Sequence, residues 1–129
     1  MLRTAGVVAL LIGTGCGSSA KSTPANYRPA QSKTSLASSG WTVANERGMQ
    51  PLAGGSQLAY FVIRSPDGVR VTTQFLDSSK RADNELKLAL RTLKSFHGAV
   101  ARNVLIFASP NGTAKLPDKA LNALRLLLR

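Results

Sequence analysis

Cysteine and histidine are almost absent from this chain of 129 residues, which contains one of each. Because Cys16 has no second cysteine to pair with, an intrachain disulfide is impossible and a cysteine metal site is not expected. His97 has no second imidazole, so we expect no zinc site either, and its position in the last turn of a predicted helix favours a structural role. We therefore predict no metal, and no motif indicates a cofactor.

The chain has only six acidic residues, and structural roles account for half of them. Asp67 lies in a turn sequence, Asp77 is a suitable helix N-cap, and Asp118 falls in the first turn of a predicted helix. Asp83 and Glu85 are two positions apart on a predicted helix, so they do not face each other. With no carboxylate pair, nucleophile elbow or phosphate loop, we expect no catalytic residue and no enzyme. The alternative is a secreted enzyme, or enzyme subunit, whose site the sequence does not reveal.

Acidic residues are also far outnumbered by basic ones, and 17 Lys and Arg against six Asp and Glu give a formal net charge of +11. Such a chain is attracted to polyanions. Four cations fall on one stripe of a predicted helix, and we call Lys80, Lys87, Arg91 and Lys94 the basic stripe. The stripe is a candidate site for anionic lipid or an acidic envelope polymer, whereas its simpler interpretation is a solvated helix face.

Aromatic residues are few, and this argues against nucleic acid as the partner of so basic a chain. Single-stranded nucleic acid is bound by exposed aromatic rings among basic side chains. The aromatic residues predicted in strands lie in core-like surroundings instead; they are Tyr60, Phe61, Phe75 and Phe107. Nucleic acid becomes the expected partner only if the chain is not exported.

The sequence lacks any apolar run of about 20 residues, the length that a membrane-spanning helix needs. Its first 20 residues contain instead a basic residue, Arg3, then a short apolar stretch over residues 5–12, and then mainly small residues over 13–20. A basic start, a short apolar core and small residues are typical of a secretory signal peptide. Ordinary cleavage after Ala20, which would release a secreted protein, and an uncleaved weak anchor are alternatives.

Small residues directly before Cys16 resemble the lipobox of bacterial lipoprotein precursors, over residues 1–16 only. The resemblance implies that 1–15 is a signal peptide cut after Gly15, and that the Cys16 thiol carries a diacylglycerol. Gly13 departs from the pattern, which usually has an aliphatic residue there. The implied location is the cell membrane or the outer membrane, lipid-anchored, with the domain on the extracytoplasmic side. The membrane is thus one expected partner, through Cys16.

The segment 16–40 starts with the cysteine expected to be lipidated. The rest of it is rich in small and polar side chains, with Tyr27 as the only aromatic. We expect this segment to be a disordered tether, because it offers too little apolar surface to offset the entropy of ordering. Residues 41–129 then form one small basic domain.

Within 41–129, the hydrophobic pattern predicts strands at 41–45, 58–63, 69–75 and 104–108 and helices at 80–97 and 117–128. The turn at 66–68 joins the second and third strands as a hairpin. The order β-β-β-α-β-α indicates an α+β fold, a small two-layer sandwich with one mostly antiparallel sheet and two helices. A right-handed crossover would place the last strand parallel to the third strand or beside the first.

Overall fold

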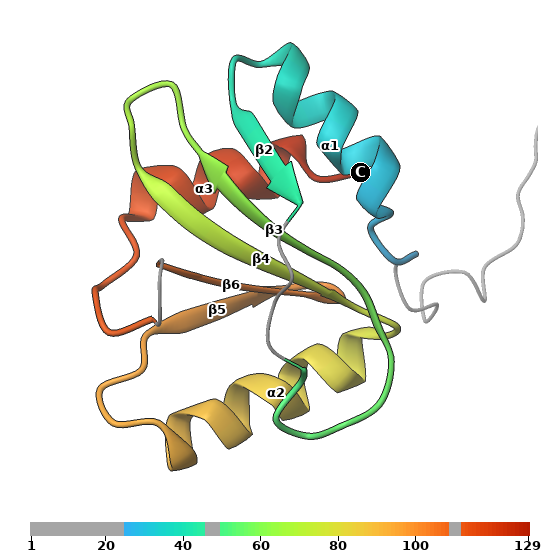
Figure 1. Cartoon of the computed structure of the whole chain (residues 1–129), viewed down its shortest axis with the longest axis vertical. Helices are drawn as coiled ribbons and strands as arrows, with labels where there is room; N and C mark the ends of the chain where they lie inside the picture. Colours follow the sequence, from blue (N-terminus) through green and yellow to red (C-terminus); the bar gives the residue numbers. More distant parts are fainter. Residues whose placement is uncertain (1–24, 46–49, 109–111) are drawn as a thin grey trace, which may run out of the picture.

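The computed structural model describes residues 25–45, 50–108 and 112–129. Its elements follow in the order α1 (Pro29–Ser38), β2 (Thr42–Asn45), β3 (Gln57–Arg64), β4 (Arg70–Leu76), α2 (Ser79–Thr92), β5 (Gly98–Ala101), β6 (Val104–Ala108) and α3 (Asp118–Leu127) (Figure 1). The expected α+β class with one antiparallel sheet is confirmed, although the described chain has three helices where two were expected.

The five strands form one sheet in the order β2-β3-β4-β6-β5, and every neighbouring pair is antiparallel. The expected hairpin of β3 and β4 is confirmed, with Ile63 opposite Val71. Its turn closes with a hydrogen bond from the Gly68 amide to the Ser65 carbonyl, and Gly68 adopts a φ of 91°. A residue with a Cβ atom is disfavoured at such an angle, which explains the glycine.

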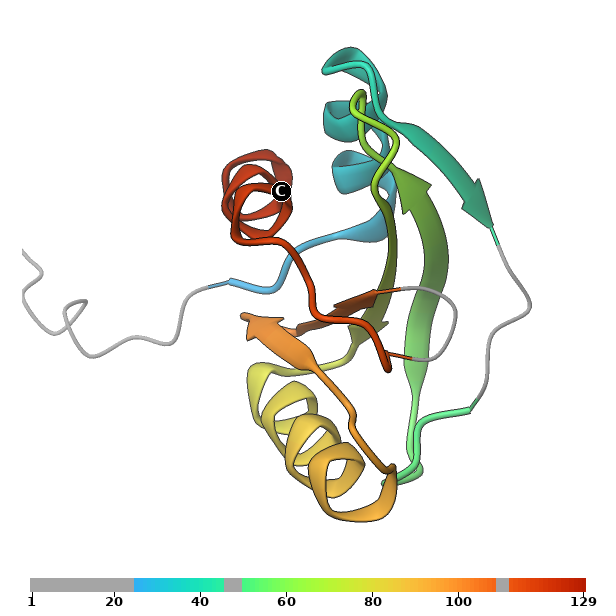
Figure 2. The same cartoon turned by 90° about the vertical axis from the view of Figure 1, so that its left-hand side faces the viewer.

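Helices cover both faces of this sheet, rather than one face as in the expected two-layer sandwich. Ile106 in β6 packs in a cluster with Leu36 of α1 and Leu124 of α3. Its neighbours Leu105 and Phe107 pack in a second cluster with Ala89 of α2. Since successive strand residues point to opposite faces, α2 lies across the sheet from α1 and α3. Figure 2 shows α3 and α2 on the two sides of the β5–β6 hairpin.

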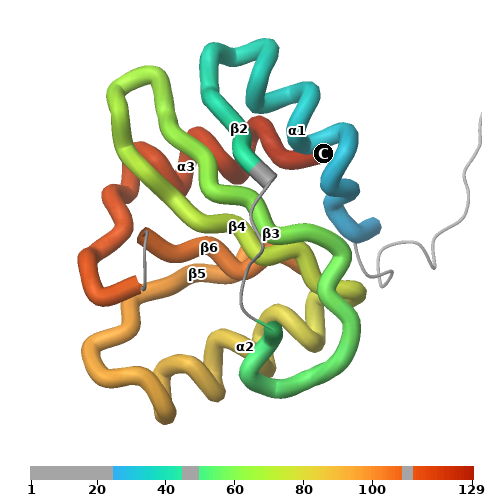
Figure 3. Tube along the Cα trace, in the orientation of Figure 1, coloured from blue at the N-terminus to red at the C-terminus, as the bar shows by residue number. Residues whose placement is uncertain are grey.

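The expected disordered tether is wrong for residues 25–40, because this part of the chain folds onto the domain. In α1, Leu36 is fully buried in the main core, and the Ser32 hydroxyl donates a hydrogen bond to the backbone oxygen of Arg129. The Arg28 amide also donates to that oxygen, so the two segments lie side by side (Figure 3). The rest of the expected tether and the signal segment lie outside the described residues.

The predicted helix 80–97 is too long, and a strand was missed after it. Helix α2 ends at Thr92; Leu93 is extended and Ser95 has a φ of 59°. Phe96 leaves the helix to pack against the Phe107 ring, with the ring centroids 5.4 Å apart. The chain then forms β5 at the sheet edge and returns as β6, antiparallel to β4. Both placements expected for the last strand are therefore wrong, because β5 reverses the direction of β6.

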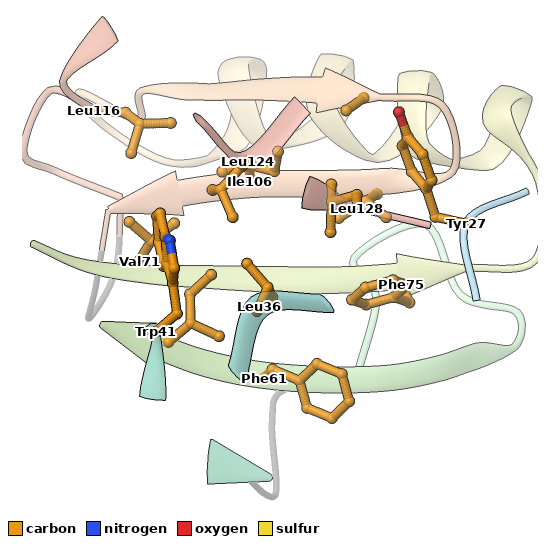
Figure 4. Packing of buried hydrophobic residues seen from close by; sticks show 13 residues of the cluster. Tyr27, Leu36, Trp41, Phe61, Val71, Phe75, Ile106, Leu116, Leu124 and Leu128 are labelled. Atoms are coloured by element: carbon orange, nitrogen blue, oxygen red, sulfur yellow. The ribbon is translucent and has the colours of Figure 1, made fainter. Parts of the chain in front are cut away.

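The larger core lies between the sheet and the pair α1 and α3. Figure 4 shows side chains from the sheet, from α1 and from the α3 segment packed together there, among them Leu36, Phe75, Leu124 and Leu128. The rings of Phe61 and Phe75 meet edge to face at a centroid distance of 5.5 Å. Each large apolar side chain buried in this way contributes about 1.5–3 kcal/mol to stability. This cluster fixes the sheet whose other face carries the candidate site.

Candidate functional site

A cavity of about 310 Å³ lies on the α2 face of the sheet. It is partly open to solvent, and its lining is mainly apolar. The lining residues come from α2 and the turn after it, from three strands, and from the segments 50–52 and 113; they are Gln50, Leu52, Tyr60, Gln74, Glu85, Ala89, Leu93, Lys94, Phe96, Leu105, Phe107 and Thr113. Ligand pockets in proteins usually have volumes of 300–1,000 Å³ and a mainly apolar lining, so this cavity is at the lower end of that range.

The cavity lies where α2 presents a small side chain, Ala89, to the sheet. The buried residues of α2 are Ala82, Glu85 and Ala89, whose spacing puts them on one helix face. Opposite them, Leu105 and Phe107 of β6 are buried and large. An alanine at 89 cannot fill the space over these side chains, so a hollow remains between helix and sheet.

One end of the cavity is formed by Phe96, whose ring fits between two glycines. A Cβ atom added at Gly98 would lie 2.6 Å from Cε2 of that ring, and one added at Gly112 would also collide with it. Real Cβ atoms do not approach so closely. The two glycines therefore leave the space that the Phe96 ring occupies, and this ring in turn forms part of the cavity wall.

Glu85 connects α2 to the segment that forms the outer wall. Its side chain is almost completely buried, and its carboxylate oxygens accept hydrogen bonds from the backbone amides of Leu52 and Ala53 at 2.5 and 2.9 Å. The two salt bridges of the described segments, Arg81 with Asp77 and Lys119 with Asp67, do not involve it. Charge-assisted bonds of this kind are stronger than neutral ones, so Glu85 holds Leu52 against the cavity.

The sequence prediction missed Glu85, although a signal for it was present. From the sequence, Glu85 was considered only as a possible partner of Asp83, which it does not face on the helix. However, Glu85 lies three residues after Ala82 and four before Ala89, on the apolar face of the helix. An acidic residue at a buried helix position must find hydrogen-bond donors, which indicates a specific structural contact.

Gln74 is the second buried polar group of the lining. Its side-chain amide donates a hydrogen bond of 2.6 Å to the side-chain oxygen of Gln57 on the adjacent strand β3. Strand β4, expected to be half-buried, is buried on both faces from Val71 to Leu76, because helices pack against both faces of the sheet. The amide is tied into the sheet, so the chemistry that the cavity offers is chiefly apolar contact.

The structure separates the four members of the basic stripe. Lys80, Lys87 and Arg91 are exposed along α2, whereas Lys94 lies beyond the end of the helix and lines the cavity. Lys80 lines a different and more polar hollow of about 440 Å³, beside the N-terminus of α2. In the described parts of the chain, Lys94 takes part in no salt bridge.

His97 was expected in the last turn of a helix, and that prediction is wrong. It lies past the end of α2, with an exposed side chain, and its backbone amide donates to the carbonyl of Gly112 at 2.8 Å. This bond connects the segment before β5 to the segment before α3. The reason for the difference is that α2 ends at Thr92, where Leu93 becomes extended, and Phe96 then packs inward in the second cluster.

Two further kinds of feature are absent from residues 25–45, 50–108 and 112–129, a metal-binding cluster and a membrane-spanning helix. No cluster there of three or more His, Cys, Asp and Glu residues could hold a metal ion. None of the helices in those ranges has the length and hydropathy needed to cross a membrane. Cys16 lies outside the described residues.

Comparison with known proteins was made for the whole chain. No protein-family model, curated protein or solved structure matches it.

Proposed function

We propose that this protein is a non-enzymatic binding domain of the bacterial cell envelope, anchored through an acylated Cys16, and that it holds a small apolar ligand in the cavity under α2. The observation that carries the proposal is the cavity of about 310 Å³, lined mainly by apolar side chains. It is roughly twice the size of an engineered 150 Å³ apolar cavity that takes up benzene. A ligand with about ten non-hydrogen atoms matches this volume.

The contacts of the polar lining residues favour binding over catalysis. Catalysis by acid–base chemistry needs a titratable side chain, such as a carboxyl group, that can reach the substrate. Both carboxylate oxygens of Glu85 already accept backbone amides, and the Gln74 amide already bonds to Gln57. These groups stabilise the walls of the cavity, and the apolar side chains between them supply the binding energy.

The anchor half of the proposal rests on the first sixteen residues, whose pattern resembles a lipobox. One cysteine carrying two acyl chains gives stable membrane attachment, whereas one chain alone is marginal. The structure describes the chain from Ala25, nine residues after Cys16. Nine residues span at most about 30 Å when fully extended, so the domain stays within that distance of the bilayer.

Intact mass of the membrane-extracted protein tests the anchor. We expect a mass corresponding to cleavage before residue 16 plus a diacylglycerol, and we expect Cys16→Ala to abolish both the modification and the membrane attachment. An unmodified chain that retains Met1 would contradict the proposal and would make nucleic acid the expected partner of so basic a protein.

Binding of 1-decanol, a neutral ten-carbon alcohol, tests the cavity. We expect chemical-shift changes at Leu93 and Leu105, which line the cavity, and none at Leu36 in the opposite core. Ala89→Leu fills the cavity and should abolish these changes. Ala37→Leu makes the same substitution at an exposed position of α1 and should leave them intact. Changes that persist in Ala89→Leu would contradict this site.

A further inference from the structure

We infer that the ligand of this cavity is an amphipathic anion, whose apolar part lies between α2 and the sheet and whose negatively charged head binds Lys94. The inference rests on the proposed function and adds the class of ligand. It depends on the charges that line the cavity, and on which of them a ligand can reach.

Two charged side chains line the cavity, Glu85 and Lys94. The Glu85 carboxylate is only 3% exposed, and the amides of Leu52 and Ala53 partly compensate its charge, so a charged head at the opening reaches Lys94 more readily. Lys94 is exposed and takes part in no salt bridge among the residues that the structure describes. The charge that a bound molecule meets at the opening is therefore positive.

The position of Lys94 after the helix end contributes to this arrangement. Because Leu93 leaves helical geometry, the chain turns there and Lys94 lines the same cavity as Leu93 and Phe96. A carboxylate or phosphate head at Lys94 would place its attached chain directly against these apolar side chains. Arg91, exposed on the last turn of α2, adds to the positive potential nearby.

A polymeric anion bound to the exposed face of α2 would use the basic stripe in a different way. It would contact Lys80, Lys87 and Arg91 together and would not need the cavity at all. The apolar lining next to Lys94 favours instead a small molecule that has both a charge and a hydrocarbon part. Filling the cavity should weaken the binding of the small molecule, whereas it should leave the binding of the polymer unchanged.

The test compares three probes that share a ten-carbon chain: decanoate, 1-decanol and decyltrimethylammonium, each below its micelle-forming concentration. They are titrated by calorimetry into the full chain carrying Cys16→Ala, so that no covalent acyl group competes. We expect decanoate to bind roughly 1.5- to five-fold more tightly than 1-decanol, the range for one exposed charge pair, and decyltrimethylammonium to bind most weakly. The advantage of decanoate should shrink as salt is raised.

Variants test separately where the charged head group and the hydrocarbon chain of a probe bind. Lys94→Glu should remove the preference for decanoate and favour decyltrimethylammonium, whereas Lys80→Glu, the same charge change at the other end of α2, should leave the order unchanged. Ala89→Leu should weaken all three probes. Leu52→Ala removes an exposed part of the lining and should also weaken the binding of all three probes. It replaces Ala89→Leu in the test if that variant does not fold.

The outcomes separate the two claims. If 1-decanol binds in the cavity but decanoate binds no more tightly, or if Lys94→Glu and Lys80→Glu act alike, the anionic ligand is refuted and the binding cavity stands. If no probe binds, or if neither Ala89→Leu nor Leu52→Ala weakens binding, both the ligand class and the proposed cavity function are refuted.

Discussion

Asn103 and Tyr27 exchange two hydrogen bonds although 76 positions separate them in the chain. The Tyr27 amide donates to Oδ1 of Asn103 at 2.7 Å, and Nδ2 of Asn103 donates to the Tyr27 carbonyl at 3.1 Å. Nδ2 also donates to the Leu76 carbonyl, so one fully buried amide joins the segment before α1, the end of β4 and the β5–β6 turn. The segment around Tyr27, before α1, thus belongs to the folded domain.

Replacing Asn103 by alanine should therefore destabilise the protein by about 2–4 kcal/mol, because several buried backbone groups lose their partners. Urea denaturation measures the change in the free energy of unfolding. Asn122→Ala, at an exposed position of α3, is the matched control and should change it by less than about 0.5 kcal/mol. Equal effects of the two variants would show that the Asn103 contacts contribute little.

Leu36→Ala tests whether α1 is part of the core. Leu36 is fully buried between α1 and the sheet, so its truncation should cost about 2–5 kcal/mol of stability. A disordered tether would give no change. Leu126→Ala serves as the control, since Leu126 is 74% exposed on α3, and it should be close to neutral. Thermal unfolding of the two variants distinguishes these cases.

Glu85→Gln should loosen the segment around Leu52 and Ala53. The glutamine amide keeps one acceptor oxygen, and its NH₂ group faces a backbone amide that also donates, so one bond is replaced by a repulsive contact. We expect a loss of about 1–3 kcal/mol and faster hydrogen exchange at these two amides.

Asp83→Asn removes the same charge from an exposed position of the same helix and is the control for Glu85→Gln. It should leave the exchange rates of Leu52 and Ala53 unchanged. If both variants accelerate exchange equally, the effect comes from the charge of α2 and not from the Glu85 contacts.

Gly98→Ala should destabilise the protein by forcing the Phe96 ring to move. The ring also lies close to Gly112, where an added Cβ atom would collide with Cε1, so little space is left for it to move to that side. A smaller side chain at 96 relieves the clash, so the double variant with Phe96→Leu should lose less stability than the sum of the two single variants. Strict additivity, measured by denaturation of the four proteins in this cycle, would mean that the ring is not held by Gly98.

Much of the fold could be predicted from the sequence because the inner strands carry a strong apolar signal. The apolar segments of β3 and β6 and the turn around Gly68 identified their strands, and the apolar stripe with Pro117 identified α3. Helix α1 gave no such signal, because its buried residues are only Ser32 and Leu36. Strand β5 consists of four residues, and its pairing with β6 defines it more than its own sequence does.

The candidate site was much harder to predict than the fold. Lys94 was identified as a basic residue, but its position at the cavity depends on the end of α2 at Thr92, which the continuing apolar pattern up to Phe96 concealed. The cavity itself results from a small residue, Ala89, facing large ones on β6, and such a mismatch is visible only when helix and sheet are placed together. Local patterns do not contain this information.

Transfer of nuclear magnetisation between bound decanoate and the protein tests the central claim most directly. The account predicts intermolecular NOEs from the methylene protons of decanoate to the methyl groups of Leu93 and Leu105, and their loss in Ala89→Leu. NOEs to Leu36 or Leu124 of the opposite core, or none to the protein at all, would contradict it.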